Sequence, residues 1–365
     1  MIPLCIPNIS GNEWEYIKDC LDTNWVSSAG SYVDTFERDF EVYIKAKKAI
    51  VTMNGTAALT LALRTLGIGV GDEIIVPSLT FISPVNTIKY VGAEPVFVDV
   101  CRDTYVMDSE KIEKLITEKT KAIMPVHLYG HPVNMDRVME IAKKYNLYVI
   151  EDATESLGSM YKGKTVGTIG DIGCFSFNGN KLITTGAGGM LVTNNNKLAE
   201  KAKFLSTQAK VITENKGFYH PEIGYNYRMP NLLAAMGCAQ LERIQEYIKA
   251  KKEHALLYNE LLKDVKGISI PEEKSWAKNV YWLYSIIVED DYSITRDQLI
   301  KKLWENKIET RPFFMPIHEM LPFKECKHSD MNITLELNKK GLNLPSSVGL
   351  SEEDIVKICE VIKSI

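Results

Sequence analysis

Short apolar runs alternate with amphipathic segments along the chain from about residue 33 to residue 245. The apolar runs predict β-strands, and the amphipathic segments predict helices that pack on a sheet. The predicted strands are 48–53, 72–81, 94–100, 121–128 and 147–152, and the predicted helices between them are 55–67, 108–120 and 135–146. This alternation is typical of an α/β fold whose mostly parallel sheet is covered by helices on both faces.

The pattern changes after residue 245. The segment 228–264 is predicted as one long amphipathic helix that bridges two lobes, and the remaining C-terminal residues predict a smaller α+β domain. Its predicted elements are a strand at 280–290 and helices at 295–307 and 351–364. We therefore expect a large domain over residues 1–245 and a small C-terminal domain over residues 246–365.

Composition narrows the class of protein. The 365 residues are enough to bury a large core, and 45% hydrophobic and 25% charged residues are close to the average of soluble globular proteins. The net charge of −4 argues against a nucleic-acid partner, and no apolar run is long enough to predict a membrane span. Seven scattered cysteines without CxxC spacing indicate free thiols in a reducing compartment. The start of the chain does not resemble a signal peptide, so we expect a cytoplasmic protein.

Polar residues follow four of the predicted strands, at positions 54–56, 80–81, 127–129 and 151–155. Ligands of open α/β sheets bind beyond the carboxyl ends of the strands. We therefore expect these four groups to meet at one edge of the sheet and to form a binding site there.

The stretch MNGTAAL places Gly55 and Thr56 between a predicted strand and a predicted helix. Gly55 permits a close backbone approach, and Thr56 offers a hydroxyl and an N–H group at the helix N-terminus, which suits one phosphate group. The alternative is an ordinary helix cap formed by Asn54 or Thr56. The spacing matches neither a Walker motif nor GxGxxG, which argues against a nucleotide-cofactor loop.

Asp152 and Lys181 are the candidate catalytic residues. Asp152 follows an apolar strand, where a carboxylate needs a cationic or hydrogen-bonding partner. One candidate partner is the protonated ring nitrogen of pyridoxal phosphate (PLP). The alternative is that Asp152 caps a helix or lies in a surface loop. Lys181 lies among glycines, hydroxyls and aromatics in GDIGCFSFNGNKLITTGAGG. A lysine shielded from water there can act as a nucleophile, as PLP enzymes require. The alternative is that Lys181 is an exposed loop lysine. This alternative is weaker, because the sequence also contains a candidate phosphate site and Asp152 at a strand end.

Six motifs, taken in order, resemble the DegT/StrS-type sugar aminotransferases, which are PLP-dependent enzymes of fold type I. The motifs are NGTAAL, PSLTF, VHLYG, EDATESLG, GDIGCFSFNGNKLITTGAGG and GYNYRM, and the resemblance extends from WVSSAGSYVDTFE to RPFFMPIH. It implies that Lys181 binds PLP covalently and that Asp152 contacts the ring nitrogen. It also implies a homodimer with shared active sites, because Asn226 matches an asparagine that reaches the phosphate in the neighbouring subunit.

The resemblance implies further contacts with the cofactor and the substrate. Gly55, Thr56 and Ser176 match the phosphate site, and Phe81 matches the aromatic residue that stacks on the cofactor ring. The expected substrate contacts are Trp25, Ser27, Ser28, Arg228 and His318.

Two positions depart from the pattern of this family. Glu155 stands where glutamine often contacts the phenolic oxygen of the cofactor, so we expect Glu155 to be protonated, displaced or turned toward the substrate. Ala187 stands where glutamate is common, and we expect this change to affect a turn and not the chemistry. Neither departure changes the predicted cofactor.

The resemblance implies transamination, because relatives that dehydrate sugars carry histidine at the position of Lys181. The expected reaction moves an amino group from glutamate, through pyridoxamine phosphate (PMP), to the C4 keto group of a nucleotide-linked 4-keto-6-deoxy sugar. The N-terminal stretch resembles enzymes that act on UDP-linked N-acetylhexosamines of the bacillosamine and legionaminic acid pathways, which predicts UDP-2-acetamido-2,6-dideoxy-hexos-4-ulose. The alternatives are amination at C3 and a non-catalytic regulatory or scaffold protein.

His127 and His131 are four residues apart, as in some metal sites. Gly130 and Pro132 would break a helix that aligned them, so we predict a loop at a strand end and no metal.

Overall fold

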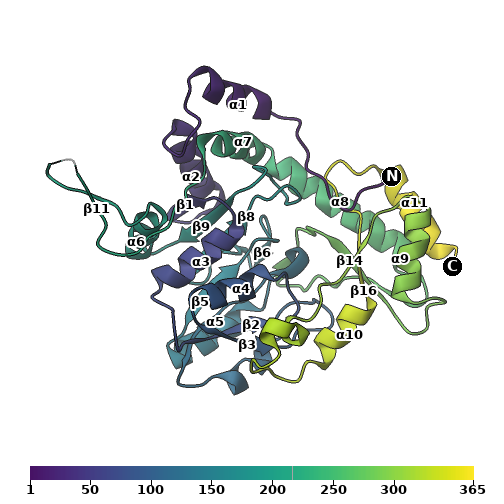
Figure 1. Cartoon of the computed structure of the whole chain (residues 1–365). Coiled ribbons are helices and arrows are strands. Elements are labelled where there is room, and N and C mark those ends of the chain that lie inside the picture. Colours follow the sequence, from purple (N-terminus) through teal and green to yellow (C-terminus); the bar gives the residue numbers. More distant parts are fainter. Residues whose placement is uncertain (216) are drawn as a thin grey trace.

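The computed structural model of the chain describes residues 1–215 and 217–365. A seven-stranded sheet forms the centre of the larger part (Figure 1), and its strand order is β1-β9-β8-β5-β4-β2-β3. The strands are β1 (Lys48–Thr52), β2 (Glu73–Pro77), β3 (Glu94–Val98), β4 (Thr120–Ile123), β5 (Tyr148–Asp152), β8 (Ile172–Ser176) and β9 (Gly189–Thr193). Only β9 runs against the others, which confirms the predicted mostly parallel sheet.

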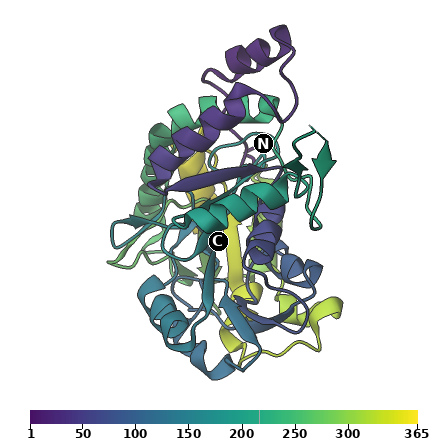
Figure 2. The ribbon, with the colours of Figure 1, turned by 90° about the vertical axis from the view of Figure 1, so that its left-hand side faces the viewer.

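Helices cover both faces of this sheet, as Figure 2 shows from the side. Successive side chains of β1 lie on opposite faces of the sheet: Ala49 and Val51 pack in one hydrophobic cluster, and Ile50 packs in another. The first cluster includes residues of α2, α5 and α7, and the second includes residues of α3, α4 and α6. The helices of this part are α1 (Glu13–Asp22), α2 (Ser31–Ile44), α3 (Gly55–Thr65), α4 (Ser83–Tyr90), α5 (Met135–Tyr145), α6 (Asn196–Ser206) and α7 (Asn231–Glu242).

The C-terminal part contains a four-stranded antiparallel sheet in the order β12-β14-β16-β15. Its strands are β12 (Ile268–Ser269), β14 (Tyr284–Val288), β15 (Arg311–Pro312) and β16 (Gly341–Leu344), and its helices are α8 (Ile244–Leu262), α9 (Arg296–Glu305), α10 (Asn332–Lys340) and α11 (Glu352–Lys363). Side chains of α8, α9 and α11 pack with one face of β14 in a separate core. This is the expected α+β arrangement, whereas the domain boundary at residue 245 stays a prediction.

Short elements complete the chain. A three-stranded sheet contains β6 (Met160–Tyr161), β7 (Lys164–Thr165) and β13 (Ala277–Lys278). A two-stranded ribbon, β10 (Val211–Ile212) with β11 (Phe218–Tyr219), extends away from the rest of the chain in Figure 1. The chain also contains the 3₁₀ turns η3 (Leu128–Gly130), η4 (Ile317–Glu319) and η5 (Leu321–Phe323).

The predicted helix at 108–120 is wrong. The segment instead forms two 3₁₀ turns, η1 (Ser109–Lys111) and η2 (Glu113–Leu115). Lys111 forms an ion pair with Asp99 at 2.8 Å, and Glu113 binds Arg137 at 3.1 Å. Contacts with two other parts of the chain therefore override the intrinsic helix preference of this segment.

The predicted single helix at 228–264 is two helices, because Arg243 between α7 and α8 has a non-helical conformation with φ −105° and ψ 6°. The guanidinium of Arg243 donates to the backbone oxygen of Ser10 at 2.9 Å. The break lets α7 pack on α1 and α2 while α8 packs on α11. Within the ranges that the structure describes, the helices are all too short or too polar to cross a membrane.

Candidate active site

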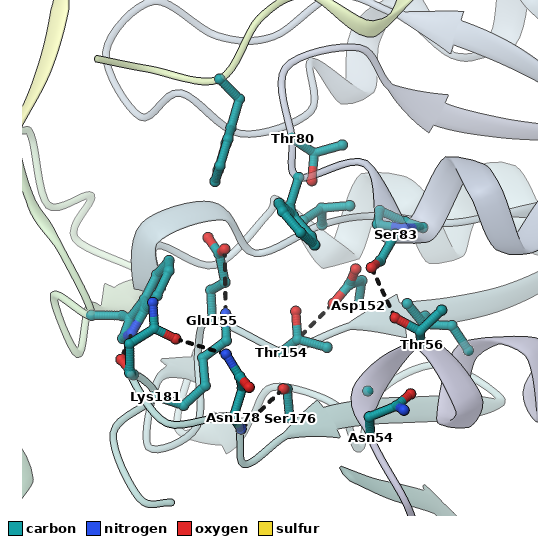
Figure 3. Close-up of a pocket in the computed structure, with 18 of the residues that line it drawn as sticks. Asn54, Thr56, Thr80, Ser83, Asp152, Thr154, Glu155, Ser176, Asn178 and Lys181 are labelled. Carbon is teal, nitrogen blue, oxygen red and sulfur yellow. Dashed lines mark hydrogen bonds and ion pairs between the residues drawn. The ribbon is translucent and has the colours of Figure 1, made fainter. Parts of the chain in front are cut away.

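A pocket of about 440 Å³ lies beyond the carboxyl ends of β1, β2, β5 and β8 (Figure 3). This volume falls in the range of small-molecule sites. Three of the four predicted strand-end groups line it; residues 127–129 are not part of the lining, although the N–H group of Tyr129 donates to the lining residue Glu155. The lining residues are Asn54, Gly55, Thr56, Leu59, Thr80, Phe81, Ser83, Pro84, Val126, Asp152, Thr154, Glu155, Ser176, Asn178, Asn180, Lys181, Trp282, Arg311 and Phe314.

The N-terminus of α3 forms one wall of the pocket. Asn54 caps the helix, because its side-chain oxygen accepts from the N–H group of Ala57 at 2.7 Å. A Cβ atom on Gly55 would lie 2.9 Å from Cβ of Ser176, so a glycine is needed for this close approach. The hydroxyls of Thr56 and Ser83 are 2.9 Å apart. The predicted cap is therefore present, and it leaves a helix N-terminus surrounded by hydroxyl groups, which suits a phosphate.

Asp152 ends β5 at the floor of the pocket and is only 2% exposed. One carboxyl oxygen accepts from the N–H group of Thr154 at 3.0 Å. Burial raises the pKa of Asp152, and the hydrogen bonds from Thr154 oppose that shift. Asp152 is thus neither a helix cap nor a surface residue. A cationic N–H donor in the pocket would stabilise its charged form.

Lys181 is also shielded from solvent, with a side chain that is 13% exposed. Its Nζ atom lies 3.4 Å from Oε1 of Glu155 and 3.8 Å from the centroid of the Trp282 ring. The indole N–H group of Trp282 donates to the backbone oxygen of Asn180 at 2.7 Å, which fixes the ring beside the lysine. The exposed-loop alternative for Lys181 is therefore wrong.

Glu155 points toward Lys181, as Figure 3 shows, and is 6% exposed. Its second carboxyl oxygen accepts from the N–H group of Tyr129 at 3.1 Å. Burial raises the pKa of Glu155, and the nearby ammonium of Lys181 acts in the opposite direction. Glu155 is therefore not displaced from the pocket, whereas its protonation state stays a prediction.

Aromatic rings close the side of the pocket. Phe81 is 51% exposed, and its ring centroid lies 5.8 Å from that of Phe314. An exposed ring on a pocket wall can stack on a flat ligand. The set of groups in the pocket fits PLP: a lysine for the aldehyde, a buried carboxyl group for the ring nitrogen, a helix N-terminus for the phosphate and an aromatic face for the ring.

The remaining predicted site residues lie outside this pocket. Asn226 is exposed, and its backbone pairs with Thr207. Arg228 donates to the backbone oxygen of Ser28. Trp25 and Ser27 are exposed in the segment before α2, and Nδ1 of His318 lies 2.7 Å from the hydroxyl of Ser78. Their contacts with a substrate or a second subunit stay predictions.

His127 and His131 take part in local contacts. Nδ1 of His127 accepts from the N–H group of Val133 at 3.0 Å, so the ring proton is on Nε2, 3.1 Å from Glu151. Nδ1 of His131 lies 2.8 Å from the backbone oxygen of Pro132. No group of three or more histidine, cysteine or acidic residues is arranged to hold a metal within residues 1–215 and 217–365.

Sequence analysis missed several lining residues. Thr154 lies inside the predicted group at 151–155, and Asn178 and Asn180 lie inside the motif around Lys181, so their positions in the chain were a usable signal. Arg311 and Phe314 belong to the RPFFMPIH stretch that extends the resemblance. Trp282 precedes a strand of the small sheet, and the aromatic run around it indicated only a buried strand.

Comparisons with known proteins agree with this geometry. The model of the DegT/DnrJ/EryC1/StrS aminotransferase family matches residues 7–363. GDP-perosamine synthase from Caulobacter vibrioides is 44% identical over 365 residues, which are 100% of this chain and 98% of that protein. GDP-perosamine synthase from Escherichia coli O157:H7 is 45% identical over 361 residues, covering 99% of this chain and 97% of that protein.

A solved structure is similar over the whole chain. The putative sugar aminotransferase Spr1654 from Streptococcus pneumoniae, in its PMP-form, has a TM-score of 0.93 and 26% identity, with 100% of this chain and 98% of that chain covered. The PLP-form of the same protein also has a TM-score of 0.93, with 27% identity and the same shares covered.

Proposed function

Because the chain belongs to the DegT/DnrJ/EryC1/StrS aminotransferase family, we propose that it transfers an amino group from glutamate to the C4 keto group of a GDP-linked 4-keto-6-deoxy sugar. The family match and the similar PLP- and PMP-forms confirm the predicted fold, cofactor and enzyme class: the chain is a PLP-dependent sugar aminotransferase. The identity of the sugar nucleotide, the donor and the amination position are the proposal.

The observation that carries the proposal is the presence of Lys181 and Asp152 in one pocket beside the N-terminus of α3. PLP, when bound, supplies an electron-poor ring that accepts the electrons released when a C–H bond of the amino donor breaks. Asp152 would hold a proton on the ring nitrogen, because its buried carboxylate needs a cationic partner. Lys181 Nζ would bind the cofactor and, when released, carry the proton away from the donor's Cα atom.

The proposed nucleotide is GDP, whereas the sequence indicated UDP. Two relatives that align with nearly the whole chain at 44% and 45% identity are GDP-perosamine synthases. The UDP-linked N-acetylhexosamine and the bacillosamine or legionaminic acid pathways are not supported by these relatives. Amination at C3 and a non-catalytic role are not favoured either.

A homodimer with shared sites is also part of the proposal. Asn226 is exposed and does not line the pocket of its own chain. Apolar side chains are exposed on and near the β10–β11 ribbon: Ile212 is 66%, Phe218 is 68% and Ile223 is 78% exposed. Such patches mark protein–protein contacts, and a second copy would cover them. Contact of Asn226 with the phosphate of the partner would then complete the site.

The test is a panel of GDP-, UDP- and dTDP-linked 4-keto-6-deoxy sugars with glutamate, scored by product mass and by the position of the new amine in NMR spectra. We expect the GDP-linked sugar to be aminated at C4 with the highest kcat/KM, and the Lys181→Ala variant to lose turnover by a factor of at least about 10⁴. Preference for a UDP-linked sugar, or an amine at C3, would contradict the proposed substrate without affecting the assignment of the cofactor.

A further inference from the structure

The pocket wall carries a second cation in addition to Lys181. Among the lining residues that the structure describes, the charged side chains are Asp152, Glu155, Lys181 and Arg311. Lys181 lies next to Glu155, and Asp152 accepts from a backbone N–H group. Three of the four charged groups therefore have a close partner within the pocket wall.

Arg311 has no comparably close partner among the described residues. Its guanidinium is 3.9 Å from Oε1 of Glu309, which is beyond hydrogen-bonding distance. The other carboxyl oxygen of Glu309 accepts from the N–H group of Leu4 at 3.1 Å. The side chain of Arg311 is 51% exposed, so most of its five N–H donors remain open to a ligand.

The backbone of Arg311 is nevertheless fixed in place. Arg311 lies in β15, opposite Asn343 of β16, and the nearby Phe313 is 2% exposed in the core. Phe314, from the same segment, lines the pocket and packs against Phe81. The small sheet therefore holds the backbone that presents the guanidinium to the pocket.

We propose that Arg311 binds a carboxylate of the amino donor while the donor's amino group lies at Lys181. This inference rests on the proposed function, because it requires an amino-acid donor. A guanidinium matches a carboxylate through two parallel hydrogen bonds. Asp152 and Glu155 would repel a carboxylate when ionised, and Lys181 must stay free to react. Arg311 is the remaining cation in the described wall.

The first test measures the donor half-reaction alone, without any sugar nucleotide. Glutamate is added to the PLP-loaded enzyme, and the loss of its visible absorbance is followed together with the 2-oxoglutarate released. For Arg311→Gln we expect the half-saturating glutamate concentration to rise by about tenfold or more, since a paired charge is lost. Arg311→Lys should recover part of this loss. Arg38→Gln, an exposed position on α2 that is paired with Asp39, is the matched control and should be unchanged.

A second measurement does not depend on turnover. Glutarate, a dicarboxylate without an amine, is titrated into the PLP-loaded enzyme by calorimetry, and we expect Arg311→Gln to weaken its binding by about tenfold. Unchanged binding of glutarate and glutamate would overturn the proposal. Weaker use of the sugar nucleotide with normal use of glutamate would also overturn it, because Arg311 would then serve the phosphates.

Alanine identifies which carboxylate is bound. It shares the α-carboxylate of glutamate but lacks the distal one. If Arg311→Gln weakens the reaction with both amino acids, Arg311 binds the α-carboxylate; if it weakens only the reaction with glutamate, Arg311 binds the distal group. Both outcomes support the proposal. The half-reaction needs no sugar, so a wrong sugar assignment would leave these results intact.

Discussion

At the scale of single residues, Glu155 is a buried carboxyl group between a backbone N–H group and the amine of Lys181. Burial raises its pKa in the folded protein above its value in the unfolded chain. Such a group stabilises the fold when the pH is below its pKa in the unfolded chain. This contribution is lost as the pH rises through its pKa in the folded protein. Glu155 therefore contributes less to the free energy of unfolding at neutral pH than at acidic pH.

We predict that Glu155→Gln stabilises the cofactor-free protein more at pH 7.5 than at pH 4.5, because glutamine carries no charge to desolvate. Urea denaturation at the two pH values measures the difference in free energy of unfolding. Glu118→Gln, at an exposed position, is the control, and we expect it to change the free energy of unfolding by the same small amount at both pH values. A Glu155→Gln effect that is the same at both pH values would contradict the assigned direction of the pKa shift.

Lys181 and Asp152 could be predicted because each lies in a local motif whose chemistry is unusual for its surroundings. Trp282 and Arg311 could not be predicted in the same way. They line the same pocket as Asp152 and Ser176, although they lie more than 100 residues further along the chain, and this depends on contacts between residues far apart in the sequence. A single sequence contains no local pattern for such contacts.

At the scale of elements, the N-terminus of α3 and the end of β8 meet without room for a side chain. A Cβ atom on Gly55 would lie 2.9 Å from Cβ of Ser176 and 3.2 Å from Cγ2 of Thr154. These contacts are closer than ordinary van der Waals contacts, so α3 or β8 would have to move. Both elements border the region proposed for the phosphate.

We predict that Gly55→Ala lowers the free energy of unfolding by about 1–3 kcal/mol, the usual range for overpacking, and weakens PLP binding. Thermal unfolding and titration of the visible absorbance with PLP measure the two effects. Gly69→Ala is the control, because the nearest atom to its added Cβ would be the backbone oxygen of Val91 at 3.6 Å. Normal PLP affinity in Gly55→Ala would show that this approach is not needed for the cofactor.

The two wrong helix predictions have a common physical cause. Periodicity identified amphipathic segments at 108–120 and 228–264, but it does not show where side chains such as Lys111 and Arg243 bind other parts of the chain. Long segments with clear apolar faces, such as α5, form as predicted because burial of that face dominates. Short or interrupted segments are decided by tertiary contacts.

At the scale of the whole molecule, the proposed dimer makes each site depend on two chains. Lys181 lines the pocket of its own chain, whereas Asn226 is exposed outside it. Inactivating substitutions at these two positions should therefore complement each other when they are on different subunits.

We predict that mixing refolded Lys181→Ala and Asn226→Ala chains in equal amounts restores about a quarter of wild-type activity. Half of the dimers formed at random would be mixed, and each mixed dimer would hold one intact site of two. Sugar amination of the mixture measures the recovery, and each variant mixed with itself is the control. No recovery, despite mixed dimers detected by mass spectrometry, would show that Asn226 does not act across subunits.

The position of β1 has a consequence for how the chain is made. β1 lies at an edge of the central sheet, and its strand partner is β9, with Lys48 opposite Thr193 and Thr52 opposite Gly189. A growing chain leaves the ribosome from its N-terminus, so β1 emerges long before β9 exists. Apolar strands without a partner promote aggregation. Nascent chains that stall before residue 189 are therefore expected to need protection by chaperones, even though most of the sheet has already been synthesised.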